Sequence, residues 1–266
     1  MKLATNGSMR LAWDEAGQGS PVLLIMGHVF PSSMWHSVIP ALSQHHRVVW
    51  FDNRGTGSSG SSRHATVSDL AADARTVLDA AGVEQAHVYG VSMGGGVAMQ
   101  LAFETPERVS SLVLGCTGFK ADDVGNVSAV RRLAYFVPLR FLRPVFRKGL
   151  YGPAVPEDAA QKDLDVLAAG KVSGRGLLGQ VEAMRTYALT AESMAALTMP
   201  ALVLHGDADT TVSLDRGRAL AAALPDARLV VYPGAGHSFY VGIEDRANGD
   251  VLTFLAEVDR HASASA

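Results

Sequence analysis

Short apolar runs alternate along the chain with segments whose apolar residues recur at helical spacing. Most of the runs have the length of a strand and are apolar on both sides, which is typical of parallel strands covered on both faces. A first run instead alternates between apolar and polar residues, as a half-buried strand does. The predicted strands are 9–14, 21–27, 47–52, 87–91, 111–116, 200–206 and 227–232.

The segments between these strands predict helices. The clearest is Thr66 to Ala81, where apolar residues recur at helical spacing and Gly82 provides a stop. The other predicted helices are 33–42, a segment after Ser92 to about 104, 213–224 and 244–258. Because strand and helix alternate, the chain is predicted to be an α/β protein whose mostly parallel central sheet has helices on both faces.

The alternation stops at about Phe119 and resumes only after Met199. The intervening sequence shows helical patterns broken by prolines, so we predict an inserted helical lid over 119–190, with 1–118 and 191–266 forming the core. Between 131 and 148 this insertion interleaves Arg and Lys with apolar residues. Such a stretch can lie on a membrane surface. A lid whose apolar face roofs a pocket explains the same pattern, and we favour it; Phe136 and Phe141 are its pocket candidates.

Composition narrows the class of protein. The 266 residues are 48% hydrophobic and carry a net charge of −3, without the basic footprint of a nucleic-acid binder. The single cysteine, Cys116, cannot form an internal disulfide. No run reaches the length of a membrane span, and the first residues lack a signal-like apolar stretch. We therefore expect a cytoplasmic protein without stable membrane insertion, with a homodimer as one possible state.

The candidate chemistry centres on Ser92. Gly90 to Gly94 fits the pattern G-x-S-x-G, placed where a predicted strand gives way to a helix. A serine at the tip of such a sharp turn requires glycine two positions before and after it, because a Cβ atom there would clash. The turn exposes the hydroxyl and aims the first N–H groups of the helix at the group it attacks. The alternative is an ordinary strand-to-helix connection.

A serine hydroxyl needs a base, and the base needs an orienting acid. His237 lies in a loop just after a predicted strand, as Ser92 does, and so do Asp207 and Asp209. The chain order serine, aspartate, histidine is the one expected of a triad assembled around such a turn. Each residue also has an ordinary interpretation as a loop or turn former, and the spacing leaves either aspartate open as the acid.

These motifs give the chain a resemblance to the α/β-hydrolase-fold serine hydrolases over nearly its full length. Residues 51–58 are similar to the F-D-x-R-G-x-G-x-S loop of that superfamily, and 200–212 to its P-x-L-x-x-x-G-x-x-D segment. The nearest in style are small esterases and enol-lactone hydrolases with a helical cap, with cofactor-free haloperoxidases among their relatives. The resemblance implies Ser92 as nucleophile, His237 as base and Asp209 as acid.

By the same resemblance, the backbone N–H groups of Met93 and His28 would form the oxyanion hole. Many members have His-Gly where this chain has Met26-Gly27, and here the histidine follows the glycine instead. Any residue except proline supplies the N–H, so the departure affects the pocket and not the hole. Trp35 and Phe239 complete the set of pocket candidates; a surface histidine beside a core tryptophan is the plainer alternative for His28 and Trp35.

The function predicted is hydrolysis of a small or medium carboxylic ester or lactone through an acyl-enzyme on Ser92, without metal or organic cofactor. Carbon–carbon bond hydrolysis and cofactor-free perhydrolysis or haloperoxidation can use the same triad, so both stay open. A ligand-binding protein of the same fold with little turnover is the alternative from another class.

Overall fold

The structure is a computed structural model that describes residues 1–265 except 120–136, 138–140, 142 and 188. Its centre is an eight-stranded sheet in the order β1-β2-β4-β3-β5-β6-β7-β8. The strand β2 pairs antiparallel with β1 and with β4. All other neighbours, from β4 through β3 and β5 to β8, pair parallel. The strands are β1 (Lys2–Asn6), β2 (Met9–Ala16), β3 (Pro21–Ile25), β4 (Arg47–Phe51), β5 (Ala86–Val91), β6 (Val109–Gly115), β7 (Ala201–Gly206) and β8 (Ala227–Tyr232). The predicted α/β class with a mostly parallel sheet is confirmed.

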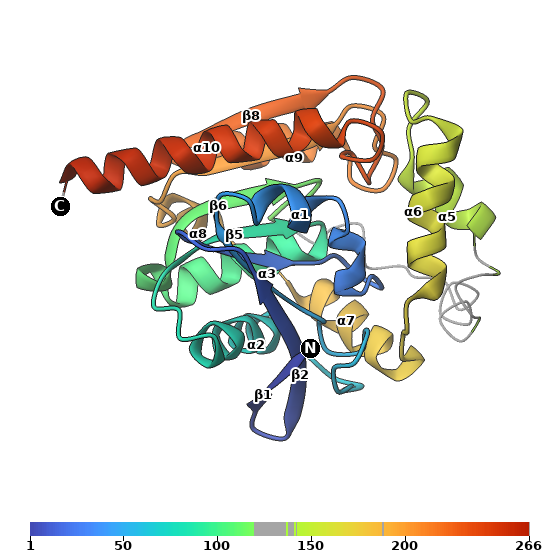
Figure 1. The fold of residues 1–266 in the computed structure, drawn as a ribbon, viewed down its shortest axis with the longest axis horizontal. Coiled ribbons are helices and arrows are strands. Elements are labelled where there is room, and N and C mark those ends of the chain that lie inside the picture. The colour runs from blue at the N-terminus through green and yellow to red at the C-terminus, as the bar shows by residue number, and fades with distance from the viewer. Residues whose placement is uncertain (120–136, 138–140, 142, 188, 266) are drawn as a thin grey trace.

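Helices cover both faces of this sheet (Figure 1). Those outside the insertion are η1 (Ser32–Trp35), α1 (Val38–Leu42), α2 (Val67–Ala80), α3 (Met93–Glu104), η2 (Pro106–Arg108), α9 (Leu214–Ala223) and α10 (Glu244–Ser265). Successive residues of the central strands divide between two buried clusters: Leu23 and Ile25 join the cluster under α2 and α3, and Val22 and Leu24 join the one under α1 and α10. The continuous apolar runs arise because both faces are covered.

Two local predictions were wrong. The strand β1 was missed because Lys2–Asn6 is mostly exposed and shows only one buried residue, Ala4. The helix predicted over 33–42 is two pieces, η1 and α1. Pro40 explains the break, because it has no N–H to donate to the carbonyl four residues earlier and its ring would clash there, so the helix restarts with the proline in its first turn.

Between β6 and β7 the described residues form helices: α5 (Arg143–Leu150), α6 (Glu157–Ala169), α7 (Gly174–Thr186) and α8 (Ala191–Ala195). We refer to α5, α6 and α7 as the cap helices. Figure 1 shows α5 and α6 standing to one side of the sheet, beyond the end towards which β8 points. They are joined to the core by Asp163 of α6, whose buried carboxylate accepts from His36 at 2.9 Å and from the hydroxyl of Tyr151 at 2.7 Å.

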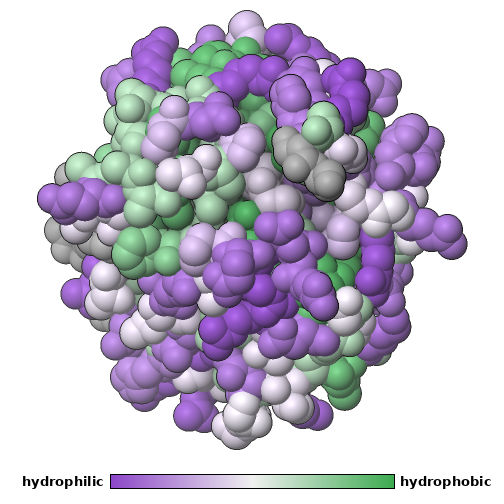
Figure 2. All heavy atoms as spheres, turned by 90° about the vertical axis from the view of Figure 1, so that its left-hand side faces the viewer, coloured by the Kyte–Doolittle hydropathy of each residue, from purple (hydrophilic) through white to green (hydrophobic). Residues whose placement is uncertain are grey.

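The basic residues of α5 are partly neutralised by α6. Arg143 pairs with Asp165 at 2.6 Å, and Arg147 pairs with Glu157. Both acidic partners lie on α6, outside the stretch 131–148 in which Arg and Lys are interleaved with apolar residues. None of the helices in the described part of the chain is long and apolar enough to cross a membrane. Figure 2 shows the opposite side of the molecule, where hydrophilic side chains cover most of the lower half.

Candidate active site

Ser92 sits in a strained turn between β5 and α3. Its backbone has φ 53° and ψ −121°, a conformation that non-glycine residues rarely adopt. A Cβ atom on Gly90 would lie 2.2 Å from the carbonyl oxygen of Gly94, and one on Gly94 would lie 2.1 Å from that of Ile25. The glycines at both positions are therefore required for the chain to turn here. The close packing around these glycines keeps the strained conformation in place, with the partly exposed Ser92 at the tip of the turn.

The end of β3 lies directly against this turn. A Cβ atom on Gly27 would come within 3.2 Å of Ser92 Cβ and 3.8 Å of Ser92 Oγ. The adjacency follows from the topology, since β3 and β5 are parallel neighbours in which Ile25 pairs with Gly90. The neighbour of β3 on the other side is β4, so the order of the strands reverses at this point, where open parallel sheets bind ligands.

His237 and Asp209 are brought together from two neighbouring loops. His237 follows β8 and Asp209 follows β7, and His237 Nδ1 lies 2.8 Å from Asp209 Oδ2. The carboxylate is buried, and its second oxygen accepts the N–H groups of Thr211 at 2.7 Å and Val212 at 2.9 Å. Burial alone would raise the pKa of Asp209, but the hydrogen bond and charge of His237, with those two N–H groups, lower the pKa overall. The carboxylate therefore stays ionised beside the imidazole.

Asp207 has a different role in the same turn. Its Oδ1 accepts the N–H of Gly234 at 2.6 Å, which ties the turn after β7 to the loop after β8. A turn-forming aspartate typically accepts a backbone N–H two residues on, and here Asp209 makes that contact, with Thr211. Geometry thus favours Asp209 as the partner of His237, and Asp207 as a brace of the loop that carries it.

The two candidate oxyanion donors flank Ser92. Met93 is the first residue of α3, where N–H groups have no acceptor within the helix. His28 follows Gly27 in a turn closed by a hydrogen bond of 3.3 Å from Phe30 N to Gly27 O. The imidazole of His28 lies 3.0 Å from Gln180 Oε1 through Nδ1, and burial lowers the pKa of His28 to about 4. His28 is therefore neutral at neutral pH.

The loop after β4 braces the site. Asp52 accepts both the N–H of Ser32, at 2.9 Å, and its hydroxyl, at 2.8 Å. Asn53 donates to the carbonyl of Met26 at 2.8 Å, next to Gly27. Arg54 makes two hydrogen bonds to buried Asp73, at 2.6 and 2.8 Å. Asp52 and Arg54 therefore brace this loop against the segment before η1 and against α2.

Two of the predicted pocket residues are core residues in the structure. Trp35 and Phe239 are fully buried and belong to the cluster under α1 and α10. Trp35 packs on Tyr89 with ring centroids 4.9 Å apart, and Phe239 stacks on Tyr232 at 5.4 Å. They are core residues, because neither presents surface to a ligand. Phe141 is 64% exposed, and Phe136 lies outside the described residues.

Residues that the sequence analysis missed connect the cap to the turn after β3. The ring of Phe146 on α5 lies 6.0 Å from that of Phe30. Gln180 on α7 is fully buried, and its side chain contacts His28, Val29 and Arg54. The pattern of α7 carries no signal that separates a buried glutamine with three partners from a solvated one, so only the tertiary structure identifies Gln180.

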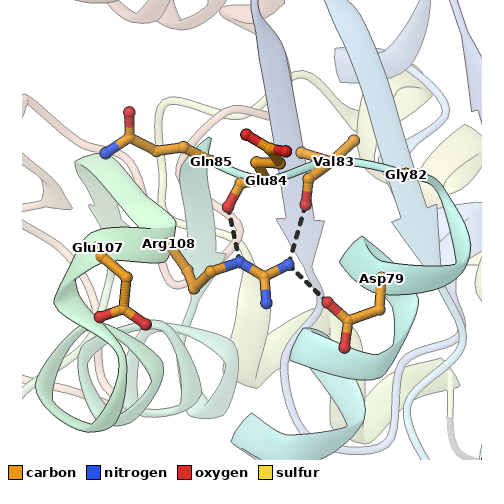
Figure 3. Close-up of a pocket in the computed structure, with 7 residues that line it drawn as sticks. All are labelled: Asp79, Gly82, Val83, Glu84, Gln85, Glu107 and Arg108. Atoms are coloured by element: carbon orange, nitrogen blue, oxygen red, sulfur yellow. Dashed lines mark hydrogen bonds and ion pairs between the residues drawn. The ribbon is translucent and has the colours of Figure 1, made fainter.

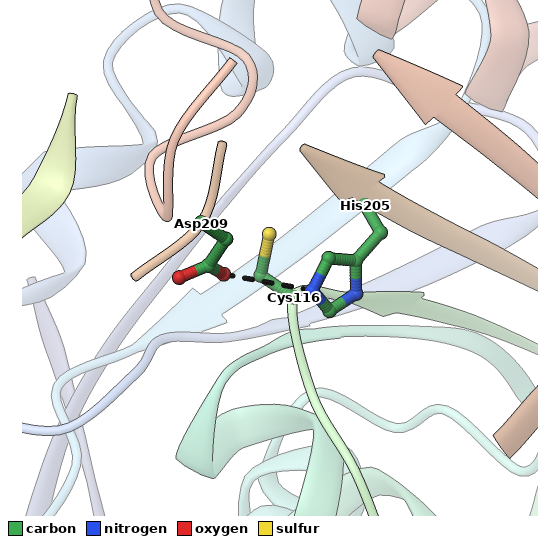
Figure 4. A group of neighbouring side chains, drawn as sticks. All are labelled: Cys116, His205 and Asp209. Atoms are coloured by element: carbon green, nitrogen blue, oxygen red, sulfur yellow. Dashed lines mark ion pairs between the residues drawn. The ribbon is translucent and has the colours of Figure 1, made fainter. Parts of the chain in front are cut away.

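Cys116, His205 and Asp209 form the one group of potential metal ligands found among the described residues (Figure 4). Their ligand atoms lie within 4.8 Å of one another, and all three residues are buried. Burial raises the pKa of the Cys116 thiol well above its usual range and lowers the pKa of His205. His205 Nε2 donates to the carbonyl of Val212 at 2.9 Å. A neutral thiol, a donating imidazole and a carboxylate already bonded to His237 do not fit a metal ion.

A surface pocket lies at the other end of the sheet, near the start of β5 (Figure 3). Arg108 points into it and donates to the carbonyls of Glu84 at 2.6 Å and Val83 at 2.9 Å, and to Asp79 at 2.7 Å. The strand β5 begins beside this pocket and ends next to Ser92, so the pocket lies at the opposite edge of the sheet from the candidate active site. Parallel sheets bind ligands at the carboxyl ends of their strands, which is the edge that carries Ser92.

The family profile described as the alpha/beta hydrolase fold matches residues 21–242. RutD of Azorhizobium caulinodans, whose name gives carbamate hydrolysis as a proposed activity, is 31% identical over 269 residues, with 98% of this chain and 100% of that protein covered. A hydrolase from Pseudomonas aeruginosa PA01 has 30% identity and a TM-score of 0.84, covering 96% of this chain and 97% of that one.

The enol-lactonase from Burkholderia xenovorans LB400 superposes with a TM-score of 0.83 and covers 96% of this chain and 100% of its own, at 23% identity, which shows a shared fold. The chain belongs to the α/β hydrolase fold family, and it is an enzyme of that family.

Proposed function

We propose that this protein hydrolyses a small or medium carboxylic ester or lactone through an acyl-enzyme on Ser92. The observation that carries the proposal is a histidine held by an ionised, buried carboxylate, on the loops that follow β7 and β8, in the same sheet whose strand β5 ends in a strained, glycine-flanked serine. A serine hydroxyl is a weak nucleophile, and this arrangement supplies its base and the acid that orients the base.

In the proposed mechanism His237 takes the proton of the Ser92 hydroxyl as the oxygen attacks the substrate carbonyl. Asp209 accepts from Nδ1, which leaves Nε2 for the serine and stabilises the imidazolium that forms. The N–H groups of Met93 and His28 stabilise the negative oxygen of the tetrahedral intermediate. His237 then protonates the leaving group, and water, activated by the same imidazole, releases the acid from Ser92.

The cap helices support a second part of the proposal, which is that residues 119–190 form a lid that sets the choice of substrate. Phe146 of α5 packs on Phe30, and the carbonyl of Leu150 accepts from Ser238 at 2.9 Å, next to His237. The cap thus contacts both the turn after β3 and the histidine loop. We propose action on small molecules in the cytoplasm, with a homodimer as a possible assembly.

Carbamate hydrolysis is the second candidate, favoured by the 31% identity to RutD over the whole chain. A carbamate presents the same kind of carbonyl to Ser92, with an amine as leaving group. Diketone cleavage and perhydrolysis would use the same residues. A substrate panel of aryl esters, lactones, carbamates and vinylogous diketones, compared by kcat/KM, separates these reactions.

The test of the nucleophile is Ser92→Ala measured on the best substrate of that panel. Turnover should be lost while the melting temperature changes little, because the serine is partly exposed at the tip of the turn. A variant that keeps most of its activity would exclude Ser92 as the nucleophile. A ligand-binding protein of this fold would show neither turnover nor labelling of Ser92 by a fluorophosphonate.

A further inference from the structure

The turn that carries His28 holds a strained residue next to the proposed oxyanion donor. Val29 has φ 66°, although β-branched residues avoid the left-handed region. Gly27 to Phe30 is closed by the hydrogen bond from Phe30 N to Gly27 O, with Val29 in the third position. A positive φ at that position alone defines a type II turn, which normally requires glycine there.

Gln180 of α7 contacts this strained turn directly. Its Oε1 accepts the N–H of Val29 at 3.2 Å, and its Nε2 donates to the carbonyl of Arg54 at 2.9 Å. A backbone N–H can only donate and a carbonyl can only accept, so these two partners fix the orientation of the Gln180 amide. The contact of 3.0 Å with His28 then requires that Nδ1 of the neutral imidazole carries the proton and donates to Oε1.

The hydrogen bond from the Val29 N–H to Gln180 involves the peptide whose orientation decides whether the turn is strained or relaxed. A type I turn over the same residues would have the His28–Val29 peptide rotated by roughly half a turn and Val29 at negative φ. That rotation would take the Val29 N–H away from Gln180 and bring the carbonyl of His28 towards the acceptor oxygen. Gln180 therefore stabilises the strained form and disfavours the relaxed one.

We propose that Gln180 is a positioning residue: from the cap it holds the peptide that follows His28 in its type II orientation and so fixes in place the residue whose N–H is the proposed oxyanion donor. The inference rests on the proposed function. It also gives the cap a second role, because α7 then supports the catalytic machinery as well as the pocket.

The test is Gln180→Met, which keeps the length of the side chain and removes its acceptor and its donor. Because loss of a whole oxyanion donor costs ~10²–10³ in kcat, a misaligned one should lower kcat about 10- to 100-fold, with KM little changed. Glu182→Ala is the matched control on the same helix, since Glu182 pairs only with exposed His64 among the contacts described. It should retain the kcat of the parent.

A double variant separates positioning from general damage. In Gln180→Met/Val29→Gly the turn can stay in its type II form without the glutamine, because glycine adopts positive φ freely. The double variant should therefore have a higher kcat than Gln180→Met alone. Equal kcat in the two would overturn the inference, as would a well-folded Gln180→Met with parental kcat. If Gln180→Met does not fold, Gln180→Glu takes its place: its oxygen still accepts the Val29 N–H, so the Val29 amide should stay protected from exchange, and fast exchange in a folded Gln180→Glu would overturn the inference.

Hydrogen exchange at the Val29 amide gives a readout that needs no substrate. Exchange should be slow in the parent protein and at least about 10-fold faster in Gln180→Met, because a hydrogen-bonded amide is protected until its bond opens. Equal exchange would overturn the inference whatever the activity. Absence of turnover and of Ser92 labelling in the parent would overturn the proposed function instead, and the exchange result would still report on the turn.

Discussion

Asp209 divides its carboxylate between the backbone and the imidazole. One oxygen accepts two N–H groups of its own turn, and the other accepts from His237. The first set of bonds fixes where the second oxygen points. The side chain therefore orients His237 from a rigid support, as a catalytic acid must.

The two neighbouring aspartates should respond very differently to loss of charge. Asp209→Asn should lower kcat by about 10³ to 10⁴, because an amide can no longer hold the reactive tautomer or stabilise the imidazolium. Asp207→Asn should keep most of kcat and lose stability, because its carboxylate accepts only the N–H of Gly234 among the contacts described. Kinetics and thermal unfolding of both variants on one ester decide between them, and a larger kcat defect in Asp207→Asn would reverse the assignment.

The lowered pKa of His28 should make the free energy of unfolding depend on pH in the acid range. Its pKa is lowered to about 4 in the fold, against about 6.5 in the unfolded chain, so between these values the unfolded state binds the extra proton. The His28 contribution to the free energy of unfolding is full above pH 6.5 and falls as the pH drops towards 4, by at most about 3 kcal/mol. The free energy of unfolding of the parent, minus that of His28→Asn, should therefore fall as the pH drops from about 6.5 towards 4 in urea unfolding. A difference independent of pH would contradict a His28 that stays neutral in the fold.

At this scale the sequence was a better guide to polar contacts than to apolar ones. The strained turn at Ser92 and the contact between Asp209 and His237 agree with the spacing of these residues after their strands, and their catalytic roles stay predictions. Trp35 and Phe239 were wrong because an aromatic side chain near a site can equally fill the core, and here both pack on tyrosines. Gln180 could not be found, since its importance arises from partners far away along the chain.

Among the elements, the turn between β5 and α3 is the most constrained. Backbone atoms of β3 and α3 lie so close to its glycines that any Cβ atom there would clash with them. Because the turn type was predicted from G-x-S-x-G and flanking periodicity alone, local sequence is sufficient where a motif has only one stereochemical solution. The helix predicted over 33–42 shows the converse, since one proline divided a pattern that otherwise favoured continuity.

Two glycine substitutions test how tightly the turn is built. Gly94→Ala would place its Cβ 2.1 Å from the carbonyl oxygen of Ile25, so the variant should lose activity and unfold at a lower temperature. Gly249→Ala in α10 has no atom within 4 Å of the new Cβ and should gain about 0.5–1 kcal/mol of stability, because alanine favours the helix. Thermal unfolding measures both, and a tolerated Gly94→Ala would mean that the turn can relax.

At the scale of the whole molecule, the insertion and the core meet at the candidate site. The carboxyl ends of the parallel strands carry the serine, aspartate and histidine loops, and the cap helices contact the turn after β3 and the histidine loop. The mostly parallel sheet with helices on both faces was predictable from periodicity. The contacts of the cap were not, because they depend on how the insertion folds back over the core.

The cap should influence which acyl groups are accepted. Phe146→Ala removes a ring that packs on Phe30, so it should change the ranking of acyl-chain lengths more than it changes hydrolysis of an acetate ester. Val145→Ala is the matched control on the same helix, since Val145 is 68% exposed and its substitution should leave the ranking unaltered. If Phe146→Ala lowers every substrate in proportion, the contact is structural only.

The acyl-enzyme at Ser92 is the step that distinguishes the proposed mechanism most directly. Mixing the protein rapidly with a p-nitrophenyl ester, quenching in acid and mapping the modified peptide by mass spectrometry measures this intermediate. The expected result is a burst of nitrophenolate that approaches the enzyme concentration, with the acyl group on Ser92 and both signals absent in Ser92→Ala. An acyl group on another residue, or a burst that survives in Ser92→Ala, would contradict the mechanism.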